Sequence, residues 1–353
     1  MFHYIGLSIG FSIGLATVDH AGYNKNLYFL EIYREKLYGR SFVLKNRFEA
    51  SEYTVTDRKT GLMWVKNAGI SEFPLTWKEA FEFTEDLNRD AHGGFTDWRL
   101  PNRRELFSLV SHENINPTLD SGHSFVNVFQ GYYWTASTCA RVPAQAWYVH
   151  FGGGKVYRGM KYASNMVWPV REPSPGRVQI PFSGQAHCFD ENGDAAPCEK
   201  HPLQHGALSS GIPWPAPRFE VANGYILDRL TGLTWTRKAC SDARFLTWKD
   251  AHEVIAGMNQ RHAYGFSDWR VPAIRELESL ADLGRHSPAL PGGHPFSEVS
   301  DFYWSGTTSM YEQRYAWAFY TKDGAVGVGF KNNPEFSLWP VRGQNDQARG
   351  NIF

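Results

Sequence analysis

An eight-residue motif that could do chemistry occurs twice in the sequence. Gly-Phe-Thr-Asp-Trp-Arg-Leu-Pro at residues 94–101 returns as Gly-Phe-Ser-Asp-Trp-Arg-Val-Pro at residues 265–272. A carboxylate, an indole and a guanidinium together could hold a sugar ring. The same set also suits a structural role, in which a bidentate carboxylate–Arg pair fixes a loop and the indole fills the core. We favour the structural role, because a unit that folds twice needs its fold determinants twice. The residues concerned are Asp97, Trp98, Arg99, Asp268, Trp269 and Arg270.

Binding is more readily expected where the two copies differ. Residues 138–145 align only loosely with residues 308–315. Loops held by a rigid scaffold are where binding residues concentrate. The alternative is that both segments are ordinary solvated loops. The candidate ligand-binding residues are Arg141, Tyr311, Arg314 and Tyr315.

Patterns for enzymatic or metal chemistry are weak. The sequence contains no Walker-type phosphate loop, nucleophile elbow or zinc-protease motif. Cys139 and Cys240 fall at non-equivalent positions of the two copies, which argues against a repeated cysteine site. His123 and His294 are equivalent, but neither has Cys or carboxylate partners at ligand spacing. We therefore predict a non-enzymatic protein with no catalytic residues, metal or cofactor.

The composition narrows the class of partner. The 353 residues include 36 basic and 36 acidic side chains, so no net field favours nucleic acid or an anionic membrane. Aromatic residues make up 15%, including 13 Trp, and these usually supply cores or binding platforms. Nucleic acid is therefore not an expected partner.

The motif must be positioned by elements that also occur twice. Capping boxes, in which a side-chain oxygen and a Glu satisfy each other's backbone N–H groups, open two predicted helices in the first unit. Alternating apolar residues then predict strands joined by a glycine-rich turn. The predicted elements are helices from Thr76 to about 87 and from Asn102 to about 110, strands 132–137 and 146–151, and a turn at 152–155.

The repeat divides the chain into two units and their flanks. Trp64, Trp77 and the closing Trp-Pro-Val-Arg segment all recur in the second unit, which indicates a duplication rather than a long repeat array. The predicted organisation is an N-terminal extension (1–46), a first domain (47–172), a linker (173–217), a second domain (218–343) and a tail (344–353).

The linker carries two cysteines around a turn signal. Cys188 and Cys198 bracket an Asn-Gly pair, which favours a hairpin. A disulfide is expected if the chain is exported, and two thiols if it stays in a reducing compartment.

The N-terminus leaves the compartment open. Residues 2–18 are mostly apolar, with glycines at every fourth position from Gly6 to Gly14. This run is short for a membrane span and suits a secretory signal better, yet no basic residue precedes it. A signal peptide, a membrane anchor and a misassigned start remain alternatives, and a periplasmic, extracellular or cell-surface location is expected.

The motifs of both units resemble those of a known bacterial family. Thr-Gly-Leu-x-Trp, Thr-Trp-x-x-Ala, the Asp-Trp-Arg motif, Arg-Glu-Leu, Tyr-Trp, Ala-Trp and the final Trp-Pro-Val-Arg resemble the Lcl C-terminal domain family, named from a collagen-like adhesin. The cysteine-flanked linker segment is similar to one often found beside such domains. The resemblance spans both units and much of the linker, about three-quarters of the chain, but not residues 1–46.

The resemblance implies a fold class and a function. The fold expected is α+β, with two tandem C-type-lectin-like domains, each of two helices around a small, loop-rich antiparallel sheet, as in the formylglycine-generating enzyme. In the adhesin the domain is implicated in binding sulfated glycans and in oligomerisation, and no family-wide binding motif carries that role to particular residues here. In lectin-like folds the late loops face the ligand.

We therefore expect a lectin-like recognition or adhesion protein that binds a surface glycan or protein through both domains, with membrane anchoring by the N-terminus as an option. The alternatives are an enzyme-like relative of the formylglycine-generating fold and a purely structural or assembly module.

Overall fold

The computed structural model describes residues 47–174, 176, 178–240 and 245–343. The expectations for the N-terminal extension and the tail lie outside these residues. In the described part of the chain, no helix is both long and apolar enough to cross a membrane. We call residues 47–172 the first repeat, 173–217 the linker and 218–343 the second repeat.

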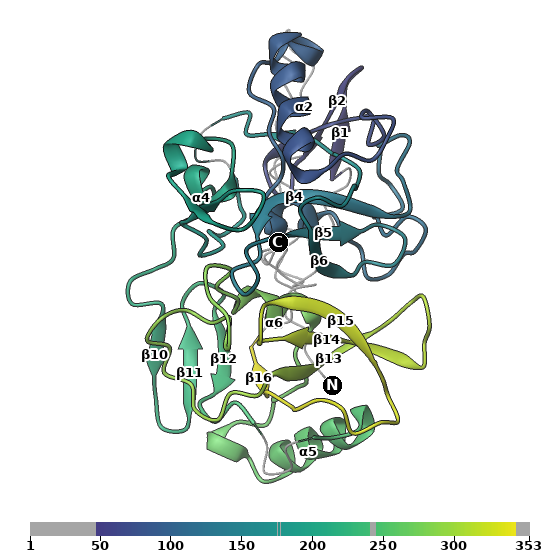
Figure 1. Cartoon of the computed structure of the whole chain (residues 1–353). Coiled ribbons are helices and arrows are strands. Elements are labelled where there is room, and N and C mark those ends of the chain that lie inside the picture. The colour runs from purple at the N-terminus through teal and green to yellow at the C-terminus, as the bar shows by residue number, and fades with distance from the viewer. Residues whose placement is uncertain (1–46, 175, 177, 241–244, 344–353) are drawn as a thin grey trace, which may run out of the picture. The chain divides into compact units, whose positions relative to one another are not determined.

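Each repeat opens and closes in a small antiparallel sheet of four strands (Figure 1). Gly61 makes the tight turn between the second and third strands of the first repeat, with a φ of 77° that favours glycine. The strand that ends the repeat returns to this sheet, so its first and last segments are pinned together. The strands are β1 (Phe48–Ala50), β2 (Thr54–Asp57), β3 (Leu62–Val65) and β7 (Val170–Arg171), repeated as β10 (Phe219–Val221), β11 (Tyr225–Asp228), β12 (Leu233–Thr236) and β16 (Val341–Arg342).

The predicted capping boxes do begin the helices. Thr76 caps the first helix together with Glu79, and Asn102 caps the second with Glu105. In the second repeat, Thr247 keeps this role, whereas Ala273 can only donate its backbone N–H to Glu276. The α-helices are α2 (Trp77–Arg89), α3 (Arg103–Ser108), α5 (Trp248–Gln260) and α6 (Ile274–Ser279), and the 3-10 turns are η1 (His92–Gly94) and η3 (Ala263–Gly265).

A six-stranded antiparallel sheet joins the two repeats. Each repeat contributes three strands, and the order β4-β5-β6-β15-β14-β13 has the boundary between repeats at its centre. There Val156 pairs with Val326. Figure 1 shows these strands lying between the two four-stranded sheets. The strands are β4 (Tyr132–Thr138), β5 (Gln145–His150), β6 (Val156–Met160), β13 (Phe302–Thr308), β14 (Tyr315–Tyr320) and β15 (Ala325–Phe330).

The largest hydrophobic core also crosses the boundary. Trp64 and Trp168 pack edge to face in the first repeat, as Trp235 and Trp339 do in the second. All four belong to one continuous cluster with Trp147 and Trp317 from the shared sheet. The two repeats therefore share their largest hydrophobic core.

The linker packs against the first repeat. Its elements are β8 (Cys188–Phe189), β9 (Ala195–Ala196), η2 (Cys198–Lys200) and α4 (His205–Leu208), which lies beside β4. Cys188 and Cys198 form a disulfide that closes the β8–β9 hairpin.

The expected fold class is wrong. The described chain is mainly antiparallel β-structure in four sheets, not two helices around one small sheet in each domain. The capping signals predicted where α3 begins, but not its length, and it ends after six residues at Ser108. The strands of each repeat divide between two sheets, one of which continues into the other repeat. Such long-range pairing leaves no local signature in the sequence.

Candidate functional site

The repeated tryptophan of the motif is internal in both repeats. Trp98 is fully buried and Trp269 almost so. The Trp98 indole N–H donates to the His92 carbonyl at 2.9 Å, while the Asn88 side chain bonds both the backbone N–H and the carbonyl of Trp98. With its donor satisfied and its ring enclosed, the indole is not available as a sugar platform.

The motif's charged residues pair differently from the expectation. Arg99 forms a bidentate pair not with Asp97 but with Glu105, with both N–O distances 2.7 Å. Arg270 and Glu276 repeat this pair at 2.6 Å. The pair ties the motif strand to the helix that follows it. Asp97 and Asp268 lie at the surface, where they accept hydrogen bonds from Arg171 and Arg342 of the closing strands.

The four late-loop candidates do not form one site. Arg314 and Tyr315 share a shallow hollow over β14 and β15, where Arg314 pairs with Glu312. Tyr311 is 67% exposed and stands outside that hollow. Arg141 instead lies 3.5 Å from Asp323 of the second repeat, an ion pair across the boundary between repeats. The two loops therefore do not face a common ligand.

The remaining cysteines are buried, and the repeated histidines are half-buried. Cys139 is buried in the first repeat, and Cys240 is buried in the second, with its sulfur 3.7 Å from the Ser337 hydroxyl. His123 and His294 pack against Phe rings, and burial lowers the pKa of both imidazoles. In the described residues, no three His, Cys, Asp or Glu side chains are placed to hold a metal ion.

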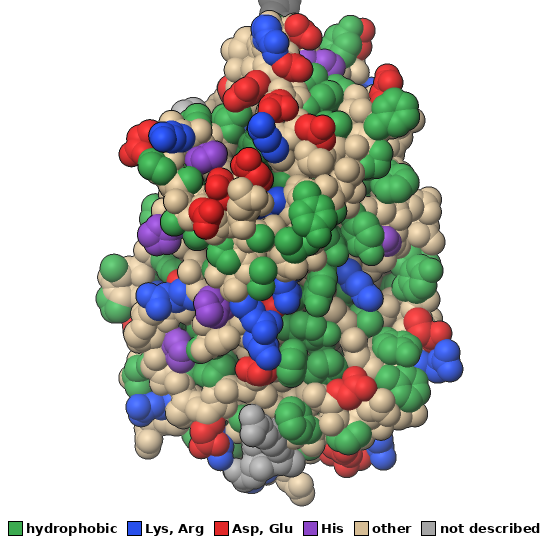
Figure 2. Space-filling model, in the orientation of Figure 1, with side chains coloured by type: hydrophobic (Ala, Val, Ile, Leu, Met, Phe, Trp, Pro, Cys, Tyr) green, Lys and Arg blue, Asp and Glu red, His purple; other side chains and the backbone are tan. Residues whose placement is uncertain are grey.

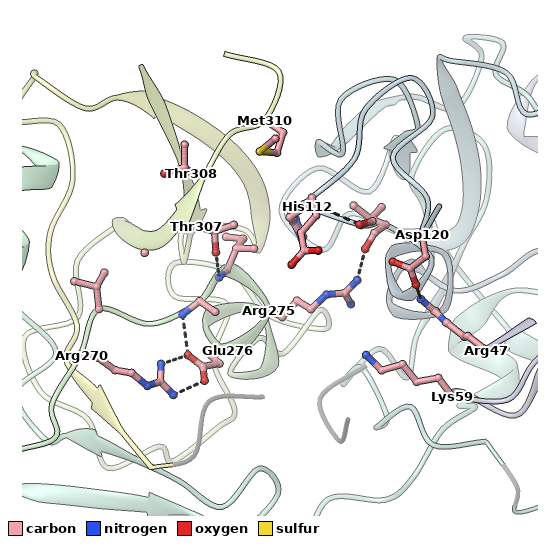
Figure 3. Close-up of a pocket in the computed structure, with 17 residues that line it drawn as sticks. Arg47, Lys59, His112, Asp120, Arg270, Arg275, Glu276, Thr307, Thr308 and Met310 are labelled. Atoms are coloured by element: carbon pink, nitrogen blue, oxygen red, sulfur yellow. Dashed lines mark hydrogen bonds and ion pairs between the residues drawn. The ribbon is translucent and has the colours of Figure 1, made fainter. Parts of the chain in front are cut away.

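A pocket of about 560 Å³ lies between the repeats (Figure 3). We call it the interrepeat pocket. The first repeat lines it with residues 110–113, Arg47, Lys59 and Asp120, and the second lines it with residues from 270–276 and 306–310. Figure 3 shows Arg275 extending from the second repeat toward the first. There its guanidinium donates to the carbonyls of Val110 and Ser108.

The charges around this pocket are held in place by partners. Arg47 bonds Asp57 with its Nε and one terminal nitrogen, and bonds Asp120 at 2.6 Å with the other. Thr307 accepts a hydrogen bond from the Ile274 backbone at the start of α6. These contacts fix the side chains that line the pocket.

A histidine in the pocket wall is kept neutral. His112 packs edge-on against Phe107 of its own repeat and Trp317 of the other. This burial, with a smaller contribution from the positive charge of Arg275, lowers the pKa of His112 to about 3. The imidazole is therefore uncharged at neutral pH.

The surface of the first repeat that is equivalent to the second-repeat wall of the pocket is covered by the linker. Here the linker lies over α3 and β4 of the first repeat. Arg104, the counterpart of Arg275, donates to the Phe182 carbonyl of the linker at 2.7 Å. The Leu283 N–H, at the counterpart of His112, donates to the Ser183 carbonyl at 2.7 Å. Among the described residues, the linker covers one of these two equivalent surfaces, and the other forms the interrepeat pocket.

Comparison with protein families explains the duplication. The sequence model of the Lcl C-terminal domain matches residues 53–171 and again residues 224–342. The chain belongs to the Lcl C-terminal domain family. The two matches lie within the two repeats, which are therefore tandem Lcl C-terminal domains. No curated protein matches the chain.

The interrepeat pocket of this tandem Lcl C-terminal domain protein was not predicted from the sequence. One signal was present, because the Arg-Glu-Leu segment is common to both domains and supplies Arg104 and Arg275. Its use could not be foreseen, because these residues meet groups more than 75 positions away in the sequence.

A second exposed surface lies on the shared sheet. Tyr132 and Tyr148 approach with ring centroids 4.6 Å apart, and Tyr157 stands opposite Tyr148 on the neighbouring strand. Tyr132 and Tyr157 are each more than 40% exposed. We call these three residues the tyrosine row. Figure 2 shows hydrophobic side chains, tyrosines included, gathered over β5 and β6 on this face.

Proposed function

We propose that this tandem Lcl C-terminal domain protein is a non-enzymatic, exported recognition protein that binds a cell-surface glycan or protein. The observation that carries the proposal is the open interrepeat pocket, whose counterpart in the first domain is filled by the chain itself. A surface that is covered by protein in one copy and open in the other is suited to receive a ligand.

Both domains contribute to this pocket, so its ligand would need the tandem. One composite site is therefore favoured over two independent sites, one in each domain. Side chains such as Arg47 and Arg270 are already fixed by ion pairs. Such preorganisation reduces the entropy lost on binding.

The disulfide supports the exported location. Cys188 and Cys198 are bonded, and structural disulfides persist mainly in the periplasm, outside the cell or at its surface. In a reducing compartment this disulfide would be reduced, and the β8–β9 hairpin would lose its covalent closure.

The tyrosine row favours the glycan arm of the proposal. Exposed tyrosine rings offer an apolar face for a sugar ring and a hydroxyl at its edge. Tyr132, Tyr148 and Tyr157 lie on three adjacent strands, which sets them on a firm platform.

Binding of the purified protein to a glycan array and to labelled bacterial or host cell-surface fractions tests the proposal. We expect binding that falls at least tenfold when Gly306→Phe fills the interrepeat pocket. Gly306 lines the pocket, and its counterpart Ala136 shows that a side chain is tolerated on this strand. Gly122→Phe is the matched control, because Gly122 is exposed and lies outside the pocket.

A second pair of variants distinguishes binding at the tyrosine row from binding at the interrepeat pocket. Tyr157→Ala would weaken glycan binding if the row is the platform, whereas Tyr162→Ala removes a ring that is 76% exposed outside the row. The absence of signal on every glycan and every surface fraction would refute the proposal and favour an assembly module.

A further inference from the structure

The linker shows in detail what the covered surface of the first domain binds. The Gln185 side-chain amide pairs with the main chain of Thr138 in both directions: the backbone N–H donates to Oε1 at 3.1 Å, and Nε2 donates to the carbonyl at 2.6 Å. Beside it, the His205 imidazole lies 2.8 Å from the Ser137 hydroxyl. Both contacts lie along the last strand positions of β4, so the linker extends the hydrogen bonding of that strand.

The same linker covers a lysine set over a tryptophan ring. The Lys161 ammonium lies 4.0 Å from the Trp77 ring centre and donates to the Asp190 carbonyl at 2.7 Å. The ammonium also makes a longer contact, 3.4 Å, to the Phe189 carbonyl, so two successive backbone carbonyls face it. Cation–π contact and carbonyl acceptors together satisfy a charge that the linker has removed from water.

The second domain repeats this surface and leaves it half exposed. Lys331 lies over the Trp248 ring at 4.4 Å, as Lys161 lies over Trp77. Its ammonium donates to the Thr308 hydroxyl at 2.9 Å, which connects it to the rim of the interrepeat pocket. Each linker-contacting residue of the first domain is at most 2% exposed, while every counterpart is partly exposed. The counterparts, which we call the docking face, are Ala273, Thr307, Thr308, Lys331 and Trp248 in place of Asn102, Ser137, Thr138, Lys161 and Trp77.

Figure 3 shows Thr307 and Thr308 on the second-domain side of the interrepeat pocket. Because Thr308 also bonds Lys331, the docking face and the pocket form one continuous surface. Within the described ranges, no segment supplies the Lys331 ammonium with main-chain carbonyls as the linker supplies Lys161.

We propose that the docking face binds a polypeptide segment of a partner protein, which presents main-chain carbonyls to Lys331 and a side-chain amide to the Thr308 peptide group. This inference rests on the proposed recognition function and names its ligand class. The first domain favours polypeptide as the ligand, because its equivalent surface is covered by the linker peptide through backbone carbonyls and a Gln amide.

One difference between the two domains indicates that the docking face prefers a segment unlike the chain's own linker. Asn102 donates to the Ser210 hydroxyl at 3.1 Å, whereas the equivalent position is Ala273, which has no side-chain donor. The docking face therefore lacks a contact that the linker uses. A partner segment with an apolar or small side chain at this point would fit better than a second copy of the linker.

Selection from a displayed library of linear and disulfide-closed peptides, on the full-length protein, tests the proposal. Enriched peptides are resynthesised with a fluorophore, and their affinity is measured by fluorescence polarisation. We expect Lys331→Gln to weaken binding about tenfold or more, because a charged hydrogen-bond donor is lost. Lys249→Gln is the matched control, since Lys249 lies on the same helix as Trp248 with a side chain that is 84% exposed.

The outcomes separate this inference from the function on which it rests. Failure to enrich any peptide, or equal binding of enriched peptides to wild type and Lys331→Gln, would overturn the polypeptide ligand. Glycan binding that requires Lys331 would overturn it too, while leaving recognition intact. Loss of every binding signal, to peptide, glycan and surface fractions alike, would remove the proposed function itself. Thermal unfolding of each variant confirms that Lys331→Gln is folded.

Discussion

At the residue scale, the side chains of the repeated motif serve the fold. Trp98 has its indole donor bonded, and Arg99 has both terminal nitrogens bonded to Glu105. Buried polar groups that are satisfied in this way stabilise a single local structure. The motif recurs because each domain needs the same brace, not because each domain has the same binding site.

Substitution of the buried indole tests this role. Trp98→Ala would leave a large cavity and remove the hydrogen bond to the His92 carbonyl, and we expect a loss of about 3–5 kcal/mol in the free energy of unfolding. Urea unfolding followed by circular dichroism measures the loss. Tyr162→Ala, at a highly exposed ring, should change stability by less than about 0.5 kcal/mol. A Trp98→Ala protein of normal stability that had lost only ligand binding would contradict the structural role.

At the scale of elements, the linker is folded against the first domain and also bonds Leu283 of the second. Its Pro, Gly, Ser and His content predicts a linker. In the structure, Ser183, Gln185 and His205 of this linker are buried and bonded. The linker docks because the strand end of β4 and the start of α3 present polar groups that need partners.

The docked linker makes stability depend on pH through His205. Burial lowers its pKa to about 4, the nearby charges of Arg99 and Arg104 act in the same direction, and Glu105 opposes them. An unfolded His titrates near 6.5, so between these values the unfolded state binds more protons than the folded state. Stability should therefore fall as pH drops from about 6.5 to 4, by up to about 3 kcal/mol from this group.

Urea unfolding at pH 7.5 and pH 5 measures this dependence. His205→Gln should reduce the difference between the two pH values, because the titrating group is gone. The reduction is partial, since His112 also has a lowered pKa, of about 3, and remains in the variant. An unchanged difference would show that His205 is not the group responsible.

At the scale of the whole described molecule, one buried anion helps hold the two domains together. Glu278 of α6 lies 3.3 Å from both Arg103 and Arg104 of α3, and all three side chains are fully buried. Burial is the main reason that the pKa of Arg103 falls to about 10, and the Glu278 charge opposes that fall. The equivalent of Glu278 in the first domain is Phe107, so the arrangement occurs once.

Removal of that charge should destabilise the molecule strongly. Glu278→Gln keeps the shape but leaves two buried guanidinium groups without their anion, and we expect a loss of about 3 kcal/mol or more. Glu253→Gln is the control, because Glu253 forms an exposed pair with Lys249 worth less than about 1 kcal/mol. Chemical unfolding of both variants measures the difference. Equal stability of Glu278→Gln and wild type would show that the pair contributes nothing to holding the domains.

The sequence by itself determined the duplication, the family and the local elements. Thr76 and Asn102 begin the helices that their capping boxes predict, because such signals act over three or four residues. It did not determine the fold class or the pocket. The pairing of Val156 with Val326 and the reach of Arg275 to Val110 join residues far apart in the chain, and no local pattern encodes them.

The difference between the two domains was likewise decided only in three dimensions. Lys161 and Lys331 stand at equivalent sequence positions, each over a tryptophan. In the described part of the chain, Lys161 is covered by the linker and Lys331 is partly exposed, because the linker lies over only one of the two equivalent surfaces. The sequence supplied two copies of the same surface, and the path of the chain decided which copy the linker covers.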